Sequence, residues 1–302
     1  MIRIAHLSDP HINQKYHPEH LAKLEAVLLD AIHKQAADHI VITGDISSNA
    51  DERDLLATRD LFRKLGILDS SRLTLVIGNH DIFGGPHLAE DVLGFPRACR
   101  DCKYHHKISE FQRIFQPLFK GVYYEANAYP FVKLVRGTAI IGLNSVAEHS
   151  QYRNPVGSNG AIDDHQFKAL QAMLETPMVQ NAKHRVLAMH HHLFRRKDEK
   201  QLHSYSTPKG LFSTIEQETL KLRKKRRLIA LLEKSNVETV LHGHVHFTGD
   251  YPRKKIRCYN AAGSIFPLIP SDTLSYNLLT FTEKGTSLEV PSVLSPLDRS
   301  LI

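Results

Sequence analysis

The chain has few cysteines and no long apolar stretch. Its 302 residues include only three cysteines, Cys99, Cys102 and Cys258. This small, odd number argues against a disulfide framework and fits a reducing compartment. No run approaches the roughly 18 uninterrupted apolar residues of a membrane-spanning helix. The N-terminus, MIRIAHLSDPHI, is charged at Arg3 and apolar for too short a length to be a signal peptide. We therefore expect a cytoplasmic protein.

The composition is that of a globular protein with many histidines. Hydrophobic residues make up 42% of the chain and charged residues 24%, which is enough for a buried core in one large or two modest domains. Lys and Arg (39) exceed Asp and Glu (32), and the resulting charge of +7 favours anionic ligands over long range. The 20 histidines are more informative, because imidazole is the commonest metal ligand and a frequent acid–base catalyst.

Short apolar runs alternate with helical patterns. Runs of strand length occur at 2–8, 39–43, 73–77, 137–143, 184–189 and 237–241. Helical periodicity occurs at 18–37, 51–65, 163–175 and 216–235. This alternation predicts a layered α/β fold. The stretches 276–282 and 286–293 predict a strand pair turned at Lys284-Gly285, and hence an added or partly antiparallel sheet.

Two regions interrupt the alternation, at 82–122 and 191–215. Both follow predicted strand ends, where open α/β sheets bind their ligands, and loops of such length are often lids or binding loops. The first is expected to carry a short helix over Ile108 to Phe119. It also contains CRDCKYHH, whose Cys99 and Cys102 suggest either a crowded zinc site or, more simply, free thiols in a loop.

Metal-competent side chains follow five of the predicted strands, where an ordinary fold would place turn residues. They are Asp9 and His11, then Asp45, then Asn79, His80 and Asp81, then His190 to His192, and finally His242, His244 and His246. In an extended segment residues i and i+2 face the same side, so Asp9 with His11, and His244 with His246, can converge on one cavity. The glycines at 44, 78 and 243 let the backbone turn sharply beside them.

The mixture of donor types limits which metal ions the site would bind. Carboxylate, amide and imidazole together suit borderline first-row ions such as Mn, Fe or Zn, and fit neither an all-oxygen calcium site nor a thiolate zinc site. Seven ligands are too many for one tetrahedral ion. They suit two ions that share a bridging carboxylate at a separation of roughly 3.5–4 Å.

In combination these motifs resemble the calcineurin-like metallophosphoesterases. The motifs are D-P-H at 9–11, G-D at 44–45, G-N-H-D at 78–81, a histidine at 190 and G-H-V-H at 243–246. Within the superfamily the chain most resembles the bacterial class III cyclic-nucleotide phosphodiesterases. The resemblance implies an α-β-β-α sandwich of two mixed sheets flanked by helices. It would form a single domain over 1–290 with insertions at about 82–122 and 191–215, followed by a C-terminal extension at 291–302.

The resemblance also implies a role for each site residue. One metal ion would be held by Asp9, His11, Asp45 and His246, and the other by Asp45, Asn79, His190 and His244, with Asp45 as the bridge. His80 would lie beside the metals as a proton donor or transition-state stabiliser, oriented by Asp81.

Two motifs depart from the family pattern. The fourth reads HHHLF instead of a histidine pair followed by proline, so the ligand is His190 or His191; we choose His190, which comes first after the apolar run. In the first motif, Pro10 is expected to hold Asp9 in an extended backbone. His242 is expected to be structural. His191 and His192 are either substrate contacts or residues that support the site or face solvent.

The expected function is a dinuclear-metal-dependent phosphohydrolase acting on a phosphodiester, either a cyclic nucleotide or a small organic diester. Metal-activated hydroxide would attack the phosphorus, and His80 would protonate the leaving oxygen. An alternative is a pyrophosphohydrolase of a nucleotide-linked lipid precursor at the membrane surface. A catalytically inactive scaffold of the same fold is the non-enzyme alternative; it would lack some ligands, and here none is missing.

The expected partners follow from the charge pattern. A small phosphorylated substrate is expected, with no stable nucleic acid complex, and the sequence leaves open a weak membrane-surface contact and a homodimer. The basic stretch Lys221–Lys234 has an apolar stripe at Leu228, Leu231 and Leu232, which favours a solvated helix packed on the sheet. Contact with anionic lipid or with nucleic acid phosphates is the alternative, although no interleaved aromatic residues support base stacking.

Overall fold

The computed structural model consists of β-sheets flanked by helices. It describes residues 1–86, 89–124, 128–195, 220–246, 248–261, 263–265 and 273–296. The strands in this part are β1 (Ile2–Leu7), β2 (His39–Thr43), β3 (Leu73–Val76), β4 (Tyr123–Tyr124), β5 (Phe131–Val135), β6 (Thr138–Gly142), β7 (His184–Ala188), β8 (Thr239–His242), β9 (Gly249–Arg253), β10 (Ile256–Asn260), β11 (Thr273–Ser275), β12 (Asn277–Thr282), β13 (Gly285–Glu289) and β14 (Ser292–Leu294). The helices are α1 (Glu19–Leu29), the π-helix η1 (Asp30–Lys34), α2 (Glu52–Lys64), α3 (Asn79–Ile82), α4 (Ala89–Asp101), α5 (Tyr104–Ile114), the 3-10 helix η2 (Gln116–Phe119), α6 (Asp164–Leu174), α7 (Pro177–Gln180) and α10 (Lys225–Lys234).

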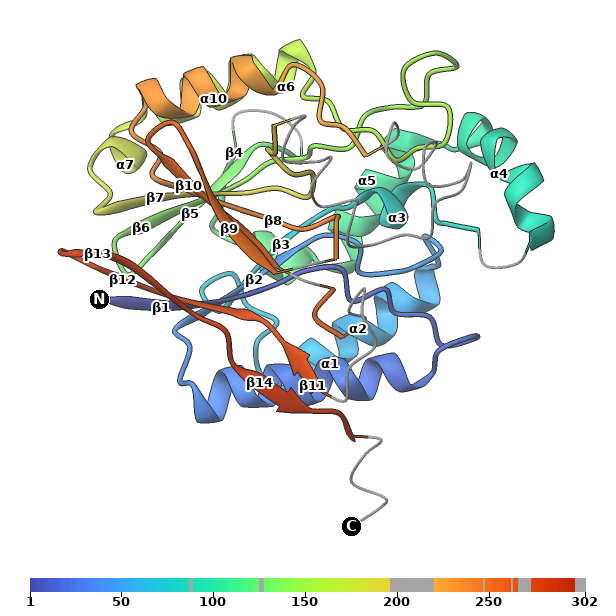
Figure 1. Cartoon of the computed structure of the whole chain (residues 1–302), viewed down its shortest axis with the longest axis horizontal. Coiled ribbons are helices and arrows are strands. Elements are labelled where there is room, and N and C mark those ends of the chain that lie inside the picture. The colour runs from blue at the N-terminus through green and yellow to red at the C-terminus, as the bar shows by residue number, and fades with distance from the viewer. Residues whose placement is uncertain are drawn as a thin grey trace.

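Two large mixed sheets lie between two layers of helices, which confirms the expected α-β-β-α sandwich (Figure 1). The five-stranded sheet has the order β13-β12-β1-β2-β3, and α1 and α2 cover its outer face. The seven-stranded sheet has the order β4-β5-β6-β7-β8-β10-β9, and α6 and α10 cover its outer face. A small two-stranded sheet of β11 and β14 lies near α1.

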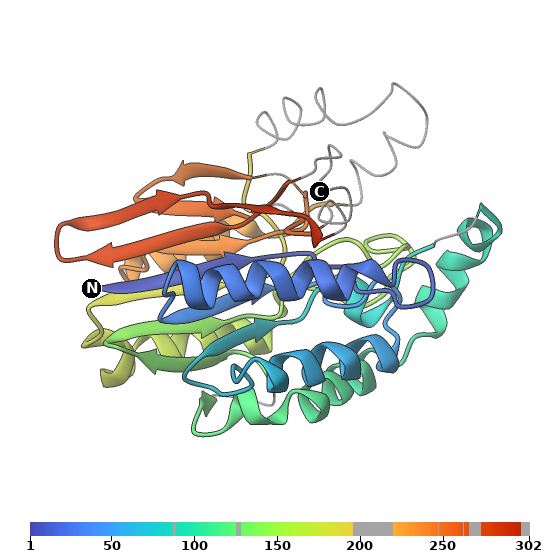
Figure 2. The same ribbon diagram turned by 90° about the horizontal axis from the view of Figure 1, so that it is seen from below.

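The central strands of each sheet are parallel, so their carboxyl ends reach one common edge. In the first sheet β1 pairs with β2 and β2 with β3; in the second, β6, β7, β8 and β10 pair in the same sense. Antiparallel strands lie outside them: β12 and β13 in the first sheet, and β5, β4 and β9 in the second. Figure 2 shows the parallel strands running from the N-terminal side toward the end at which α4 projects.

Apolar side chains and capped helices hold these layers together. One core joins the first sheet to α1 and to the second sheet, and includes Leu24, Leu278 and Ile140. The other packs the second sheet under α6 and α10. Asp163 caps α6 by accepting a hydrogen bond from the Gln166 backbone N–H at 2.8 Å. Such a cap satisfies a donor at the start of the helix that has no partner within the helix itself.

Three elements differ from the sequence expectation. The helix expected over 18–37 is α1 continued by η1 and ends at Lys34, shortly before Ala36 adopts a φ of 49°. The helix expected over 216–235 begins at Lys225, because the buried Leu222 instead forms a β-bridge with Gly160; residues 216–219 lie outside the described part. The strand expected over 286–293 is divided into β13 and β14 around Pro291, which cannot donate a ladder hydrogen bond.

The insertion at 82–122 is largely helical. The expected helix over 108–119 starts earlier, as α5, and is followed by η2, while α4 was not anticipated because Pro96 lies inside it. The insertion at 191–215 falls mostly outside the described residues, as does the end of the extension at 291–302. Among the helices of the described ranges, none combines the length and the apolar character needed to cross a membrane.

Candidate metal centre

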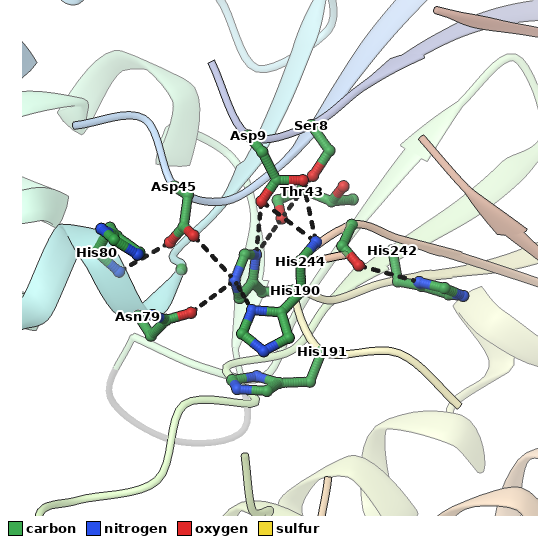
Figure 3. Close-up of polar contacts among 12 residues, drawn as sticks. Ser8, Asp9, Thr43, Asp45, Asn79, His80, His190, His191, His242 and His244 are labelled. Atoms are coloured by element: carbon green, nitrogen blue, oxygen red, sulfur yellow. Dashed lines mark hydrogen bonds and ion pairs between the residues drawn. The ribbon is translucent and has the colours of Figure 1, made fainter. Parts of the chain in front are cut away.

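All seven predicted ligand residues lie at the shared carboxyl edge of the two sheets. They are Asp9 and His11 after β1, Asp45 after β2, Asn79 at the start of α3, His190 after β7, and His244 and His246 after β8. Figure 3 shows Asp9, Asp45, Asn79, His190 and His244 directed toward one another. Because strands of both sheets supply these residues, the site forms only when the sheets are stacked.

The loops that carry the ligands are not extended. Five ligand residues adopt left-handed backbone conformations: φ is 51° at Asp9, 44° at His11, 51° at Asp45, 77° at His244 and 48° at His246. The expectation of an extended backbone at Asp9 is therefore wrong. Backbone hydrogen bonds join the loops after β1 and β2. The Asp9 N–H donates to the Gly44 carbonyl at 3.1 Å, and the His11 N–H donates to the Asp45 carbonyl at 2.9 Å. Such conformations are uncommon outside glycine and concentrate at functional sites.

Two glycines allow the ligand loops to approach closely. A Cβ atom at Gly243 would lie 1.7 Å from Ser8 Oγ and 2.4 Å from Asp9 Oδ2. A Cβ atom at Gly78 would lie 2.2 Å from Asp45 Oδ1. These glycines therefore serve close approach between loops, where any side chain would push a ligand carboxylate away.

One set of donor atoms gathers around His11. Its Nε2 lies 3.0 Å from His246 Nε2 and 3.7 Å from Asp45 Oδ2, and His246 Nε2 lies 3.8 Å from Asp9 Oδ1. These four residues are the set that the family resemblance assigned to one ion.

A second set gathers around His190. Its Nε2 lies 2.9 Å from Asn79 Oδ1, 2.9 Å from His244 Nδ1 and 3.3 Å from Asp45 Oδ2. Asp45 Oδ2 is therefore close to both sets of donors. That position is the one a bridging carboxylate requires.

The donor chemistry fits a pair of metal ions. In each set two imidazole nitrogens face each other at about hydrogen-bond distance, where a shared cation would satisfy both lone pairs. His190 Nδ1 donates to the Thr43 carbonyl at 2.8 Å, so Nε2 of the neutral ring presents its lone pair to the cluster. Ligand histidines are commonly oriented by such a hydrogen bond to a carbonyl. The imidazole, carboxylate and amide donors suit borderline divalent metals.

The charges at the site are strongly coupled. Burial by itself raises the pKa of the Asp45 carboxyl, but the neighbouring His190, His80 and His11 hold it well below its usual range. Burial lowers the pKa of His190, whereas the carboxylates of Asp45 and Asp9 raise it to about 9. The proton on His190 thus occupies the position beside Asp45 that a cation would take, so binding of metal there releases a proton.

His80 lies beside the two donor sets. Its backbone N–H donates to Asp45 Oδ1 at 2.8 Å, and its ring Nδ1 donates to the Ser48 carbonyl at 2.9 Å. The ring packs edge-on against His11, with the centroids 4.7 Å apart. Since a carbonyl oxygen can only accept, Nδ1 carries a proton, and Nε2 is the atom that can exchange a proton with a substrate.

Asp81 has a different role from the one expected. Its Oδ1 accepts from Ser47 N–H and its Oδ2 from Gly78 N–H, each at 2.9 Å, so it joins the loops after β2 and β3. Burial, and then the charge of Asp45, raise the pKa of Asp81 to about 8. The ring of His80 is oriented instead by Ser48, whose contribution is a backbone carbonyl that no side-chain motif could reveal.

The neighbouring histidines make contacts within the protein. The His191 ring is hydrogen-bonded elsewhere: its Nδ1 lies 2.9 Å from Ser145 Oγ and its Nε2 lies 3.2 Å from the Ser158 carbonyl oxygen. His190, not His191, therefore faces the other donors. His192 is buried, and its Nδ1 accepts from Phe194 N–H. His242 Nε2 lies 2.6 Å from Tyr251 Oη, as expected for a structural residue.

The two cysteines of the first insertion, Cys99 and Cys102, lie outside the metal-competent clusters in the described part of the chain. Cys99 is buried, and Cys102 Sγ donates to the Ile82 carbonyl at 3.3 Å. The metal-competent clusters found among the described residues contain histidine and carboxylate groups without cysteine. The simpler prediction, that these are free thiols, agrees with this arrangement.

Comparison with known proteins extends these observations. The family model described as calcineurin-like phosphoesterase matches residues 2–247. No curated protein matches the sequence. A solved dimetal phosphatase from Danio rerio is 12% identical, with a TM-score of 0.59 over 97% of this chain and 99% of that one. A purple acid phosphatase from yellow lupin (Lupinus luteus) seeds is 13% identical, with a TM-score of 0.50 over 97% of this chain and 51% of that one. At these identities the likeness to both structures concerns the fold.

Proposed function

Because the chain belongs to the calcineurin-like phosphoesterase family, and is therefore a metal-dependent phosphoester hydrolase, we propose that its substrate is a phosphodiester. The diester is a cyclic nucleotide or a small organic diester. The observation that carries this proposal is the pair of donor sets sharing Asp45 Oδ2, with His80 beside them. We also propose a cytoplasmic location, which the three free thiols support.

The proposed ligands divide between the two ions as the donor atoms do. Asp9, His11, Asp45 and His246 would hold one ion, and Asp45, Asn79, His190 and His244 the other. Two bound ions of Mn, Fe or Zn would supply Lewis acidity toward the phosphoryl oxygens and would activate water for attack.

The role of His80 is to place a proton on the leaving oxygen. Asp45 fixes the backbone of His80 and Ser48 fixes its ring, so Nε2 is held in one direction at the edge of the site. A positioned donor of this kind stabilises an alkoxide leaving group as the P–O bond breaks, and such proton transfer typically contributes about 10²–10⁴-fold to the rate. Asp81 supports the geometry by joining the two loops behind His80.

Among the described residues, the charges around the site favour a diester over a monoester. The charged groups that act most strongly on Asp9 and Asp45 are histidines and the two carboxylates themselves. A diester carries one negative charge at the phosphoryl group, which the bound metal ions would balance. A monoester dianion gains more from additional Arg or Lys hydrogen bonds.

The basic helix gives less support to a membrane-surface pyrophosphohydrolase. α10 is packed on the sheet by Leu228, Ile229 and Leu232. Of the expected apolar stripe, Leu231 is only partly buried, and Ile229 is buried in addition. Arg227 of α10 pairs with Asp164 and stacks on the Phe167 ring, 3.8 Å from the ring centroid. This arginine is thus engaged within the protein.

The proposal is tested by comparing hydrolysis of bis(p-nitrophenyl) phosphate and p-nitrophenyl phosphate. Chelator-stripped protein would be reconstituted in turn with Mn, Fe, Zn and Mg. We expect metal-dependent cleavage in which the diester is hydrolysed faster than the monoester. Faster cleavage of the monoester would refute the diester assignment. No cleavage with any metal, although two ions are bound, would refute it in favour of a pyrophosphate substrate, to be tested with nucleotide-linked lipids.

A further inference from the structure

A separate cluster of side chains that can act as metal ligands lies at the start of α1. His17, Glu19 and His20 offer ligand atoms that all lie within 4.8 Å of one another. His17 Nδ1 is 3.5 Å and His20 Nε2 is 3.8 Å from Glu19 Oε1. We propose that these three residues form a third, peripheral binding site for a zinc-class divalent cation. This proposal is independent of which phosphoester the enzyme hydrolyses.

The distances suit a tetrahedral ion. Ligand atoms at the usual 2.0–2.2 Å from zinc are about 3.3–3.6 Å apart, close to the separations of 3.5 and 3.8 Å from Glu19 Oε1. Small side-chain rotations therefore suffice to complete the coordination. Two imidazoles and one carboxylate are also a ligand set that holds zinc in other proteins, with a fourth position left for water.

His20 is already oriented for this role. Its Nδ1 lies 2.8 Å from the His11 carbonyl oxygen, which can only accept, so Nδ1 carries the proton and Nε2 carries the lone pair. The side chain is 2% exposed, and its ring stacks on that of His17 at 4.8 Å with 10° between the planes. A ligand histidine with its second nitrogen held by a carbonyl loses little freedom when a metal binds.

The other two ligands are open to solvent. The side chains of His17 and Glu19 are 43% and 28% exposed, so an ion can enter directly and keep a water ligand. The His17 backbone N–H donates to Asn13 O at 2.8 Å, which closes the loop before α1 and holds His17 near the helix. The cluster is thus both preformed and accessible.

Lys23 is expected to lower the affinity of the site for a cation. Its Nζ lies 4.0 Å from Glu19 Oε1, so its positive charge opposes a bound cation. The peripheral ion should therefore bind more weakly than the two ions of the catalytic centre. The hydrogen bond from His20 to the His11 carbonyl connects this site directly to a catalytic ligand residue, so its occupancy would stiffen the loop that carries His11.

The test is to count zinc ions per full-length chain by equilibrium dialysis and elemental analysis over rising zinc concentration. The wild-type protein should reach three ions, and His17→Ala should stop at two. The matched control His33→Ala removes another exposed histidine, on η1, and should still reach three. Glu19→Gln provides a second variant that should likewise stop at two.

Removing the positive charge of Lys23 provides an independent test of zinc affinity. Lys23→Gln should bind the third ion about fivefold more tightly, because it removes a positive charge a few ångströms from the cation. Saturation of the wild-type protein at two ions would overturn the proposal. So would equal loss of zinc from His17→Ala and His33→Ala, which would indicate unspecific binding to surface histidines. Either result would leave the diester and monoester rates, and hence the proposed function, unaffected.

Discussion

Substitution of Gly243 by alanine tests whether the close approach of the ligand loops is needed for the metal centre. The added Cβ would lie 1.7 Å from Ser8 Oγ, 2.6 Å from Ser8 Cβ and 2.4 Å from Asp9 Oδ2. Rotation of the serine hydroxyl cannot relieve the second and third contacts. The backbones must separate, and Asp9, which accepts from His244 N–H at 3.0 Å, must move with them.

The expected loss follows from the size of that movement. Restoring contacts of 2.4–2.6 Å to ordinary van der Waals separations requires about 1 Å of displacement, and a misplacement of that size can lower catalysis about 100-fold. We expect Gly243→Ala to lower kcat/KM for bis(p-nitrophenyl) phosphate by about that factor and to bind fewer than two metal ions. Steady-state kinetics and elemental analysis on the same preparation measure both effects.

Gly94→Ala is the matched control. Gly94 lies within α4, and a Cβ there has no neighbour within 4 Å among the described atoms. This variant should keep full activity and gain about 0.5–1 kcal/mol in the free energy of unfolding, because alanine is the better helix former. Wild-type kinetics with two bound ions in Gly243→Ala would refute the argument that the approach of these loops positions the ligands.

Two further predictions concern His80 and Asp45 in the metal centre and the buried Lys133. His80→Ala should retain both metals but lose at least about 100-fold in kcat, whereas Asp45→Ala should lose metal and activity; normal metal content in the Asp45 variant would contradict its bridging role. Burial lowers the pKa of Lys133 to about 7, although Asp69 opposes this effect. The unfolded chain therefore binds more protons between about pH 7 and 10.4, and stability should rise with pH across that window. Lys133→Met should flatten this rise and add about 1–4 kcal/mol to the free energy of unfolding at pH 7. Urea titrations over the pH range measure this, and an unchanged slope would contradict it.

The identity of the site residues could be predicted from sequence, whereas their conformation could not. Polar residues directly after apolar runs mark the carboxyl ends of strands, and this pattern located Asp9, Asp45 and His190. The left-handed backbone of Asp9 depends on a hydrogen bond to Gly44 and on close packing against Gly243, two positions remote from it in the chain. Such conformations are imposed by tertiary contacts that local propensity does not encode.

The secondary structure, too, could be predicted only in part. Fully buried strands such as β2 could be predicted from the sequence, because an unbroken apolar run is typical of a parallel strand covered on both faces. β9 was missed because it is a partly exposed edge strand, contains Pro252 and has no apolar pattern. The π-helical turn after α1 was also unpredictable from periodicity, since it coincides with a hydrogen bond from Tyr276 to Asp30 across nearly the whole chain.

The pairing of β1 with β12 has a consequence for synthesis. β1 lies in the middle of its sheet, and its register joins Ile2 to Phe281 and His6 to Asn277. At typical rates of about 5–20 residues per second, translation reaches β12 on the order of tens of seconds after β1. Throughout that interval β1 presents a bare apolar edge of the kind that promotes aggregation. The nascent chain therefore passes through a long interval in which its first strand must be shielded.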